Sequence, residues 1–161
     1  MKRITGYLCL LAAVSLTATA NTDTLAGELK ELRSEKRRIA DAANELGALA
    51  RTSHINSWET HAIALEQMKE LINRSGARIA RLQNLAGGSA QALELREQLA
   101  AVAKHVTELK QQINENRLAI RMPAYYWEAM KLVQAAEQSQ AAVERVMNAA
   151  LSRGAAKQAA D

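Results

Sequence analysis

Apolar residues recur along most of this chain at alternating spacings of four and three, a pattern typical of helices that pack lengthwise against other helices. Three segments keep the alternation over eight successive positions, at residues 25–50, 61–86 and 95–120. A fourth segment, at residues 126–150, follows it more loosely and is rich in alanine. Each stripe predicts one long helix. The abundance of Ala, Leu, Glu, Gln, Lys and Arg agrees with that prediction, because these residues favour helix.

Some stripe positions hold polar residues, among them His61 and Ser75 in the second stripe. Lys36 lies in the first stripe and Asn116 in the third. A polar residue at such a position can fix the register of packed helices or mark a polar spot in the core. For Lys36 we favour a simpler account, in which the stem of the side chain covers apolar surface and the amine reaches solvent.

The segments between the stripes carry residues that begin and end helices. Asn56 is expected to cap the second helix, with Glu59 reaching back to the Asn56 amide as in a capping box. Gly87 and Gly88 are expected to end that helix, and Ser89 to cap the third. Pro123 is the single proline of the chain. We expect it in the first turn of the fourth helix, where its missing N–H leaves no helical hydrogen bond unmade.

Four helices of about 30 residues, each about 45 Å long, joined by short turns, predict an all-α fold. We expect an up-down-up-down four-helix bundle. The alternative is an elongated helical hairpin or coiled coil that dimerises with a second chain. Both arrangements bury the same apolar stripe, so the spacing alone does not separate them.

The first twenty residues have the features of a bacterial signal peptide. Lys2 and Arg3 precede an apolar run at residues 7–16, and Ala18 and Ala20 then match the small-x-small pattern at which signal peptidase cleaves. The run is too short to serve as a stable membrane anchor. We therefore expect residues 1–20 to be cleaved and the mature protein to lie in the periplasm or be secreted, with an uncleaved N-terminal anchor as the alternative.

The rest of the chain divides into a helical bundle domain, residues 21–151, and a tail, residues 152–161, that we expect to be frayed. The single cysteine, Cys9, lies inside the predicted signal peptide, so the mature protein is expected to have neither a disulfide nor thiolate chemistry. Without Lys2 and Arg3, 19 basic residues remain against 17 acidic ones, a balance that argues against a nucleic-acid partner. No later segment is apolar enough to be an integral membrane segment.

The mature chain has only four aromatic residues, and all of them lie at the expected starts of helices. Trp58 begins the second helix, and Tyr125, Tyr126 and Trp127 lie in the first turn of the fourth. In an up-down-up-down bundle these two helices start at the same end. His54, His61, Arg51 and Arg121 are expected at that end as well.

This end of the bundle is the one candidate binding site. Helix N-termini and arginines favour anions, and aromatic rings favour flat or apolar groups. The candidate ligand-binding residues are therefore Trp58, His61, Arg121, Tyr125 and Trp127, and a small organic anion or an acidic peptide would suit them. The alternative is that the aromatic side chains only plug the end of the bundle against water.

Known catalytic and metal-binding patterns are missing from the sequence. It contains no Gly-x-Ser-x-Gly, no Gly-rich phosphate loop, no Glu-x-x-His and no Cys-x-x-Cys-His. His61 and His105 are expected about 15 Å apart along the bundle axis, too far to share one ion. We therefore expect a protein that is not an enzyme, with no catalytic residue, no metal and no cofactor.

The stretch SWETHA at residues 57–62, with MPAY at residues 122–125, resembles a set of exported helical proteins of the acidobacterial kind that carries no known activity. The other residues that carry the resemblance are Leu65, Met68, Lys69, Asn73, Gly76 and Leu82. It covers roughly residues 41–136 and implies a bacterial, exported, helical protein without adding a site. The chain departs from the pattern at residues 88–92, where related chains often carry a tryptophan after Gly-Ser and this one reads GSAQA.

These observations predict an exported, non-enzymatic helical bundle that acts as a protein-interaction or structural module in the cell envelope. Its partner is expected to be another protein or a second copy of itself. Two alternatives remain open. One is a small-ligand or metal-binding bundle with a site at the Trp58/Trp127 end, and the other is a periplasmic chaperone-like stress protein.

Overall fold

The computed structural model describes the backbone of residues 5–160 and the side chains of residues 24–156 and 159. Within that range the chain forms α1 (Thr5–Arg51), α2 (Trp58–Ala86), α3 (Ala90–Glu115), a short 3-10 helix η1 (Arg117–Arg121) and α4 (Pro123–Ala160). The predicted signal peptide covers residues 1–20, whose side chains lie outside the described ones, and it stays a prediction. No helix in the described range is long and apolar enough to cross a membrane.

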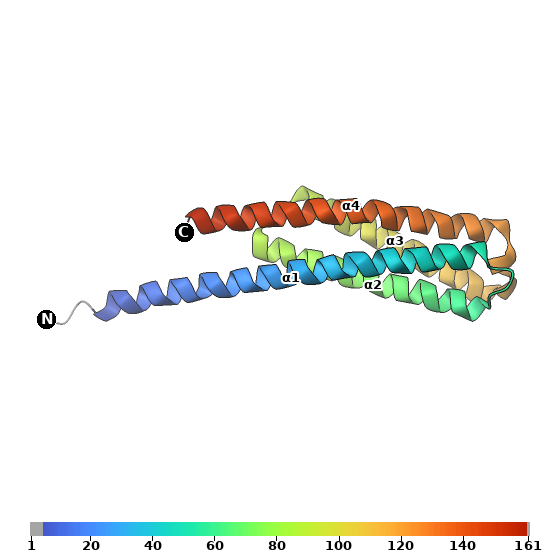
Figure 1. Cartoon of the computed structure of the whole chain (residues 1–161), viewed down its shortest axis with the longest axis horizontal. Coiled ribbons are helices and arrows are strands. Elements are labelled where there is room, and N and C mark those ends of the chain that lie inside the picture. The colour runs from blue at the N-terminus through green and yellow to red at the C-terminus, as the bar shows by residue number, and fades with distance from the viewer. Residues whose placement is uncertain (1–4, 161) are drawn as a thin grey trace.

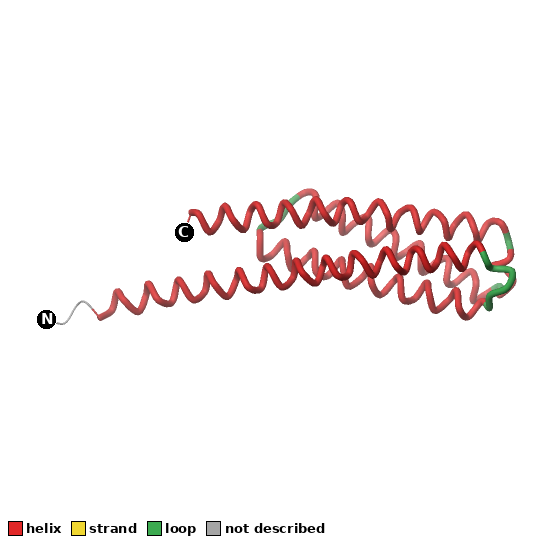
Figure 2. Tube along the Cα trace, in the orientation of Figure 1, coloured by secondary structure: helices red, strands yellow, loops and turns green. Residues whose placement is uncertain are grey.

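The helices run up, down, up and down along one rod, as Figures 1 and 2 show. α1 packs against α2 and α4, and α3 packs against the same two helices on the other side. The predicted four-helix bundle is therefore confirmed, and its four stripes cover one another within a single chain. One end of the rod, which we call the tip, holds the 52–57 loop and η1; the α2–α3 turn lies toward the other end (Figure 1).

The stripes form one continuous core along the rod. Its largest fully buried side chains come from all four long helices, and burying each apolar one contributes about 1.5–3 kcal/mol relative to leaving it exposed. These side chains are Leu32, Ile39, Leu46, Leu65, Met68, Ile72, Ile79, Leu82, Leu95, Ile113, Leu132 and Tyr125.

Lys36 and Asn116, two polar residues of the predicted stripes, lie outside the core in the structure, as expected for Lys36. Lys36 is only half-buried, and its amine pairs with Glu144 at the surface of α4, so its side chain does reach toward solvent. The polar residue that enters the core is its neighbour, Glu35. Asn116 does not lie in the core: it is exposed, α3 ends at Glu115, and the Asn116 side chain accepts a hydrogen bond from the Leu118 amide at the start of η1.

The helix ends follow the expected chemistry with one correction. Ser57, not Asn56, caps α2, because the Ser57 hydroxyl accepts from the Thr60 amide. The Asn56 side chain instead donates to the Thr52 carbonyl at the end of α1, so the predicted capping box does not form. Gly87 ends α2, Ser89 caps α3 by accepting from the Ala92 amide at 3.1 Å, and α4 begins at the expected proline.

Each of the four interfaces between neighbouring helices carries a charged or polar pair. The pairs are Arg78–Glu35 between α1 and α2, Lys110–Glu66 between α2 and α3, His105–Glu128 between α3 and α4, and Lys36–Glu144 between α4 and α1. Pairs near the surface contribute little free energy, about 0.2–1 kcal/mol each. They act mainly by favouring this order and register of the helices over others.

The end of α4 extends past the boundary that the sequence suggested. α4 continues as a helix through residues 152–160, and fraying of this tail stays a prediction. The Arg153 guanidinium donates to the Gly87 carbonyl at 3.0 Å and to the Gly88 carbonyl at 2.8 Å. This contact fixes the last turns of α4 against the α2–α3 turn.

Candidate functional site

The tip brings together two of the residues predicted to form a site. His61, one turn into α2, and Tyr125, in the first turn of α4, are 0% and 1% exposed. The His61 Nδ1 atom and the Tyr125 hydroxyl lie 2.6 Å apart, within hydrogen-bond distance. Their rings meet edge to face, with centroids 5.2 Å apart at 74°. The expectation that α2 and α4 start at the same end therefore holds at the level of side chains.

Both groups are neutral near pH 7, and burial reinforces the neutral form of each. Removal from water disfavours the charged form of each, which lowers the pKa of His61 below 6.5 and raises the pKa of Tyr125 well above 10. Within the described part of the chain, His61 Nε2 has no hydrogen-bond partner. The pair is closed to solvent in this structure, and its contact fills the space between α2 and α4 at the tip.

Trp58 takes part in a different contact. The ring is half-buried, and the Arg117 guanidinium lies 4.8 Å from its centroid. A cation over an aromatic face is favourable by about 0.5–1 kcal/mol at an exposed site. Sequence reasoning named Arg121 and missed Arg117, because it carried the third helix through residue 120 and did not expect η1.

The other two predicted residues, Arg121 and Trp127, lie on the outside of the protein. Trp127 is 63% exposed, and its ring meets that of its neighbour Tyr126 edge to face, with centroids 5.1 Å apart. The hollow beside Trp127 is lined by residues of α4 alone. The five candidate residues therefore do not converge on one pocket.

The histidines and carboxylates of the tip do not assemble a metal site. No group of three or more His, Cys, Asp or Glu side chains within the described range is placed to hold an ion. His54 is exposed, and His105 bonds to Glu128 at 2.9 Å between α3 and α4. Glu128 also accepts a hydrogen bond from Lys131 at 2.7 Å. The contact with Lys131 lowers the pKa of Glu128 most, and the contact with His105 lowers it further.

The buried carboxylate of Glu35, between α1 and α2, is another polar feature that the sequence did not predict. The Glu35 side chain accepts from Arg78 Nε at 2.8 Å and from the Ser75 hydroxyl at 3.3 Å. Arg78 also reaches Glu28 at 3.0 Å. Each oxygen of the Glu35 carboxylate therefore has a partner on α2, so we interpret the contact as a structural ion pair between the two helices.

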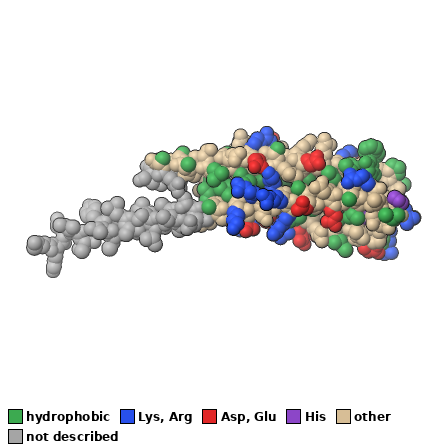
Figure 3. Space-filling view, viewed as in Figure 1, with side chains coloured by type: hydrophobic (Ala, Val, Ile, Leu, Met, Phe, Trp, Pro, Cys, Tyr) green, Lys and Arg blue, Asp and Glu red, His purple; other side chains and the backbone are tan. Residues whose placement is uncertain are grey.

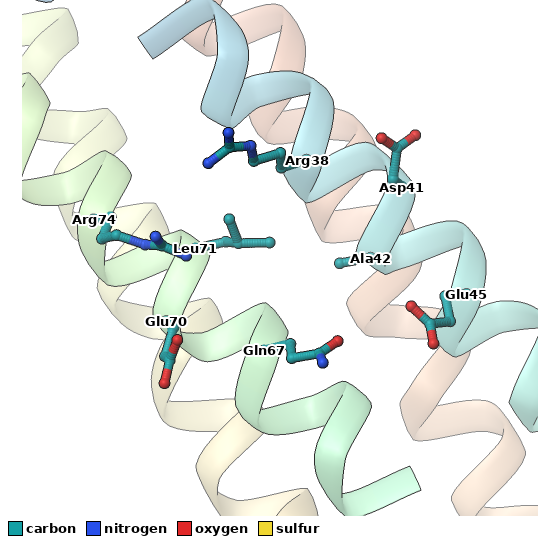
Figure 4. A pocket seen from close by; sticks show the side chains of 8 residues that line it. All are labelled: Arg38, Asp41, Ala42, Glu45, Gln67, Glu70, Leu71 and Arg74. Carbon is teal, nitrogen blue, oxygen red and sulfur yellow. The ribbon is translucent and has the colours of Figure 1, made fainter. Parts of the chain in front are cut away.

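An open groove runs between α1 and α2, with a volume of about 290 Å³. Figure 4 shows Arg38 and Arg74 extending from the two helices toward the gap between them. The side chains that line it are Arg38, Asp41, Ala42, Glu45, Gln67, Glu70, Leu71 and Arg74. Guanidinium and carboxylate groups are mixed along both walls, as on a solvated helix surface.

The most unusual property of the tip is its exposed apolar side chains. Ile55 is 73% exposed, Leu118 is 65% exposed and Met122 is 55% exposed. Figure 3 shows hydrophobic side chains gathered at this end of the rod, together with basic ones. We call this set the tip surface. It consists of Ile55, Leu118 and Met122 with the exposed Arg51, Arg117 and Arg121.

No family model, no curated protein and no solved structure matches this chain.

Proposed function

We propose that the protein is an exported, non-enzymatic four-helix bundle that binds another protein in the bacterial cell envelope through its tip surface. The observation that carries this proposal is that three of the seven large apolar side chains exposed in the described part of the chain, Ile55, Leu118 and Met122, lie at one end of the rod. Exposed apolar side chains gathered in one region mark interaction sites in proteins that otherwise bury such groups.

The chemistry of the tip surface favours a partner of a particular kind. Three arginines, at positions 51, 117 and 121, stand among the apolar side chains. Arginine and methionine are enriched at protein interfaces, and charged groups steer complementary partners. We propose a partner that presents apolar side chains flanked by acidic ones.

The non-enzymatic part of the proposal is supported by the state of the titratable groups. His61 and Tyr125 have shifted pKa values, but they are buried against each other and closed to solvent. Glu35 is held by Arg78 and Ser75. Catalytic groups with shifted pKa values lie in clefts that a substrate can enter.

A photo-crosslinking experiment tests the proposal. A benzophenone amino acid is placed at Leu118 in the full chain, expressed in its own bacterium, and the same amino acid at Gln98, exposed on α3, is the matched control. We expect one protein adduct that depends on position 118. Introducing Ile55→Asp together with Met122→Asp is expected to lower its yield about tenfold or more, the size of a hot-spot loss.

Equal adducts from positions 98 and 118 would contradict the proposal. So would adducts at position 118 that contain only lipid, because the tip would then contact a membrane surface. Circular dichroism of the Ile55→Asp, Met122→Asp variant verifies that the bundle still folds, which is expected because both positions are exposed.

A further inference from the structure

The buried His61–Tyr125 contact joins the two segments that carry the apolar residues of the tip surface. His61 lies one turn into α2, directly after the 52–57 loop, and Tyr125 lies on α4, directly after η1. The Tyr125 amide donates to the Met122 carbonyl at 3.1 Å, and the Met122 amide donates to the Ala119 carbonyl of η1 at 2.9 Å. Through these bonds the contact sets where residues 117–122 lie relative to the loop.

The environment of His61 disfavours a second proton on its ring. The Nδ1 atom lies 2.6 Å from the Tyr125 hydroxyl, and Nε2 has no hydrogen-bond partner within the described part of the chain. A doubly protonated imidazole is a cation whose two nitrogens both donate. Its Nε2–H would therefore be buried without an acceptor. Burying a charged donor in this way is much less favourable than exposing it to water.

The charged groups around the tip do not compensate for a charge on His61. The side chain that contacts it, the Tyr125 hydroxyl, stays neutral because burial raises its pKa. Glu66 on α2 and Glu128 on α4 are each bound to a lysine near the surface. The pKa of His61 is accordingly lowered by burial. The other charged side chains at the tip are exposed, and they are Arg51 of α1, Glu59 of α2, Glu115 of α3, and Arg117 and Arg121 of η1.

We propose that His61 is a pH-sensitive gate for the tip surface. In its neutral form it holds α4 against α2. When it gains a proton in acid it leaves Tyr125 for water, and residues 117–122 separate from the 52–57 loop. Because the apolar residues of the tip surface lie on both of these segments, the partner is bound near pH 7.5 and released near pH 5.5. The gate rests on the proposed function, since it regulates binding at the same surface.

Amide hydrogen exchange of the full chain without a partner tests the opening. Rates at residues 117–126 are measured at pH 7.5 and 5.5 and divided by the rates of unstructured peptides at the same pH. In the open tip His61 titrates near pH 6.5, so the protection of these amides is expected to fall by about three- to tenfold, ten being the limit for one proton. Residues 86–92 at the α2–α3 turn should keep their protection. Unchanged protection at residues 117–126, or an equal loss at both ends of the rod, would overturn the gate.

Two variants that cannot gain the proton separate His61 from other titrating groups. The His61→Leu, Tyr125→Phe double variant and the His61→Gln single variant are both expected to exchange alike at the two pH values. The second variant keeps the test decisive if the first does not fold, which circular dichroism verifies. His54→Gln, at an exposed histidine of the loop, is the matched control and should keep the wild-type pH dependence. A wild-type pH dependence that persists in a folded His61 variant would overturn the gate.

Photo-crosslinking from position 118 at the same two pH values tests the effect on binding. The adduct yield is expected to fall about threefold or more at pH 5.5, and to stay constant in the double variant. An adduct that forms equally at both pH values overturns the gate and leaves the proposed function intact. The absence of a position-dependent adduct at both pH values overturns the proposed function, and the exchange rates then decide whether the tip opens in acid.

Discussion

At the scale of single residues, the His61–Tyr125 pair makes the packing of the tip sensitive to pH. The imidazole is neutral in the folded bundle because burial lowers its pKa below 6.5, whereas in the unfolded chain it titrates near 6.5. Below that value the unfolded chain binds more protons than the folded one. By linkage, the free energy of unfolding therefore decreases as the pH falls through 6.5 and toward the folded pKa.

We predict a loss of stability of up to about 1.4 kcal/mol per pH unit, the limit for one proton, in urea unfolding between about pH 7 and pH 5. The His61→Leu, Tyr125→Phe double variant removes both polar groups and is expected to flatten this dependence. Its stability at pH 8 should stay close to wild type, because replacing both partners of a buried hydrogen bond leaves neither unpaired.

His54 provides the control for that experiment, because it is exposed in the 52–57 loop. His54→Gln should retain the pH dependence of the wild-type chain. The carboxylates whose pKa values are lowered, Glu66, Glu128 and Glu144, lose their contribution only below about pH 4.5, outside the measured range. A double variant with the wild-type slope would show that His61 is not the group responsible.

The polar residues inside the bundle were the part that the sequence predicted least well. His61 and Ser75 were placed correctly in the core because they fall at stripe positions. Glu35 was missed because a stripe is counted from apolar letters, and the apolar count put Lys36 there instead. Arg78, which pairs with Glu35 across the interface, is the residue that could have indicated a buried Glu35. The sequence of one helix alone, however, does not determine which residues of α1 lie opposite which residues of α2.

At the scale of whole elements, the ends of helices depend on single backbone positions. The backbone of Gly87 has φ of 82° and ψ of 147°, a conformation that side-chain-bearing residues rarely adopt. The space around its Cα is open, because no neighbouring atom lies within 4 Å of the place that a Cβ would occupy. Any cost of substitution there therefore comes from the backbone and not from a clash.

We predict that Gly87→Ala lowers the free energy of unfolding by about 1–3 kcal/mol, measured by urea denaturation. Gly88→Ala is the matched control, because Gly88 is the next residue, is equally open and lacks the positive φ. Its effect should stay within about 0.5 kcal/mol. Similar losses at both positions would mean that the turn does not hold this conformation in solution.

The end of α3 shows why periodicity alone misplaces an element boundary. Ile113 and Ile120 are both buried and keep the stripe spacing. The spacing therefore predicted one helix that runs through both residues. The Asn116 side chain ends α3 by bonding to the Leu118 amide, and η1 then returns Ala119 and Ile120 to the core. Asparagine competes for backbone bonds in this way, and that local chemistry, rather than the stripe, sets the boundary.

At the scale of the whole molecule, the two ends of the rod are closed by different means. The tip is closed by the buried His61–Tyr125 contact between α2 and α4. Toward the other end the α2–α3 turn is held by Arg153 of α4, whose guanidinium donates to the Gly87 and Gly88 carbonyls. A cation beside carbonyls at the C-terminal end of a helix also interacts favourably with the helix dipole.

The Arg153 contact predicts which part of the rod opens first when it is lost. Arg153→Met keeps most of the apolar stem but removes the two charge-assisted hydrogen bonds to the Gly87 and Gly88 carbonyls, together with a third to the Ala149 carbonyl within α4. Amide hydrogen exchange should therefore accelerate at residues 86–92 by about tenfold or more, the change expected from about 1.4 kcal/mol or more of lost local stability. The tip should exchange as in wild type, because His61 and Tyr125 lie at the opposite end of the bundle. Arg145→Met, at an exposed position of the same helix, is the control and should change neither end. Acceleration spread evenly over the chain would instead mean that the bundle opens as one cooperative unit and that Arg153 stabilises it as a whole.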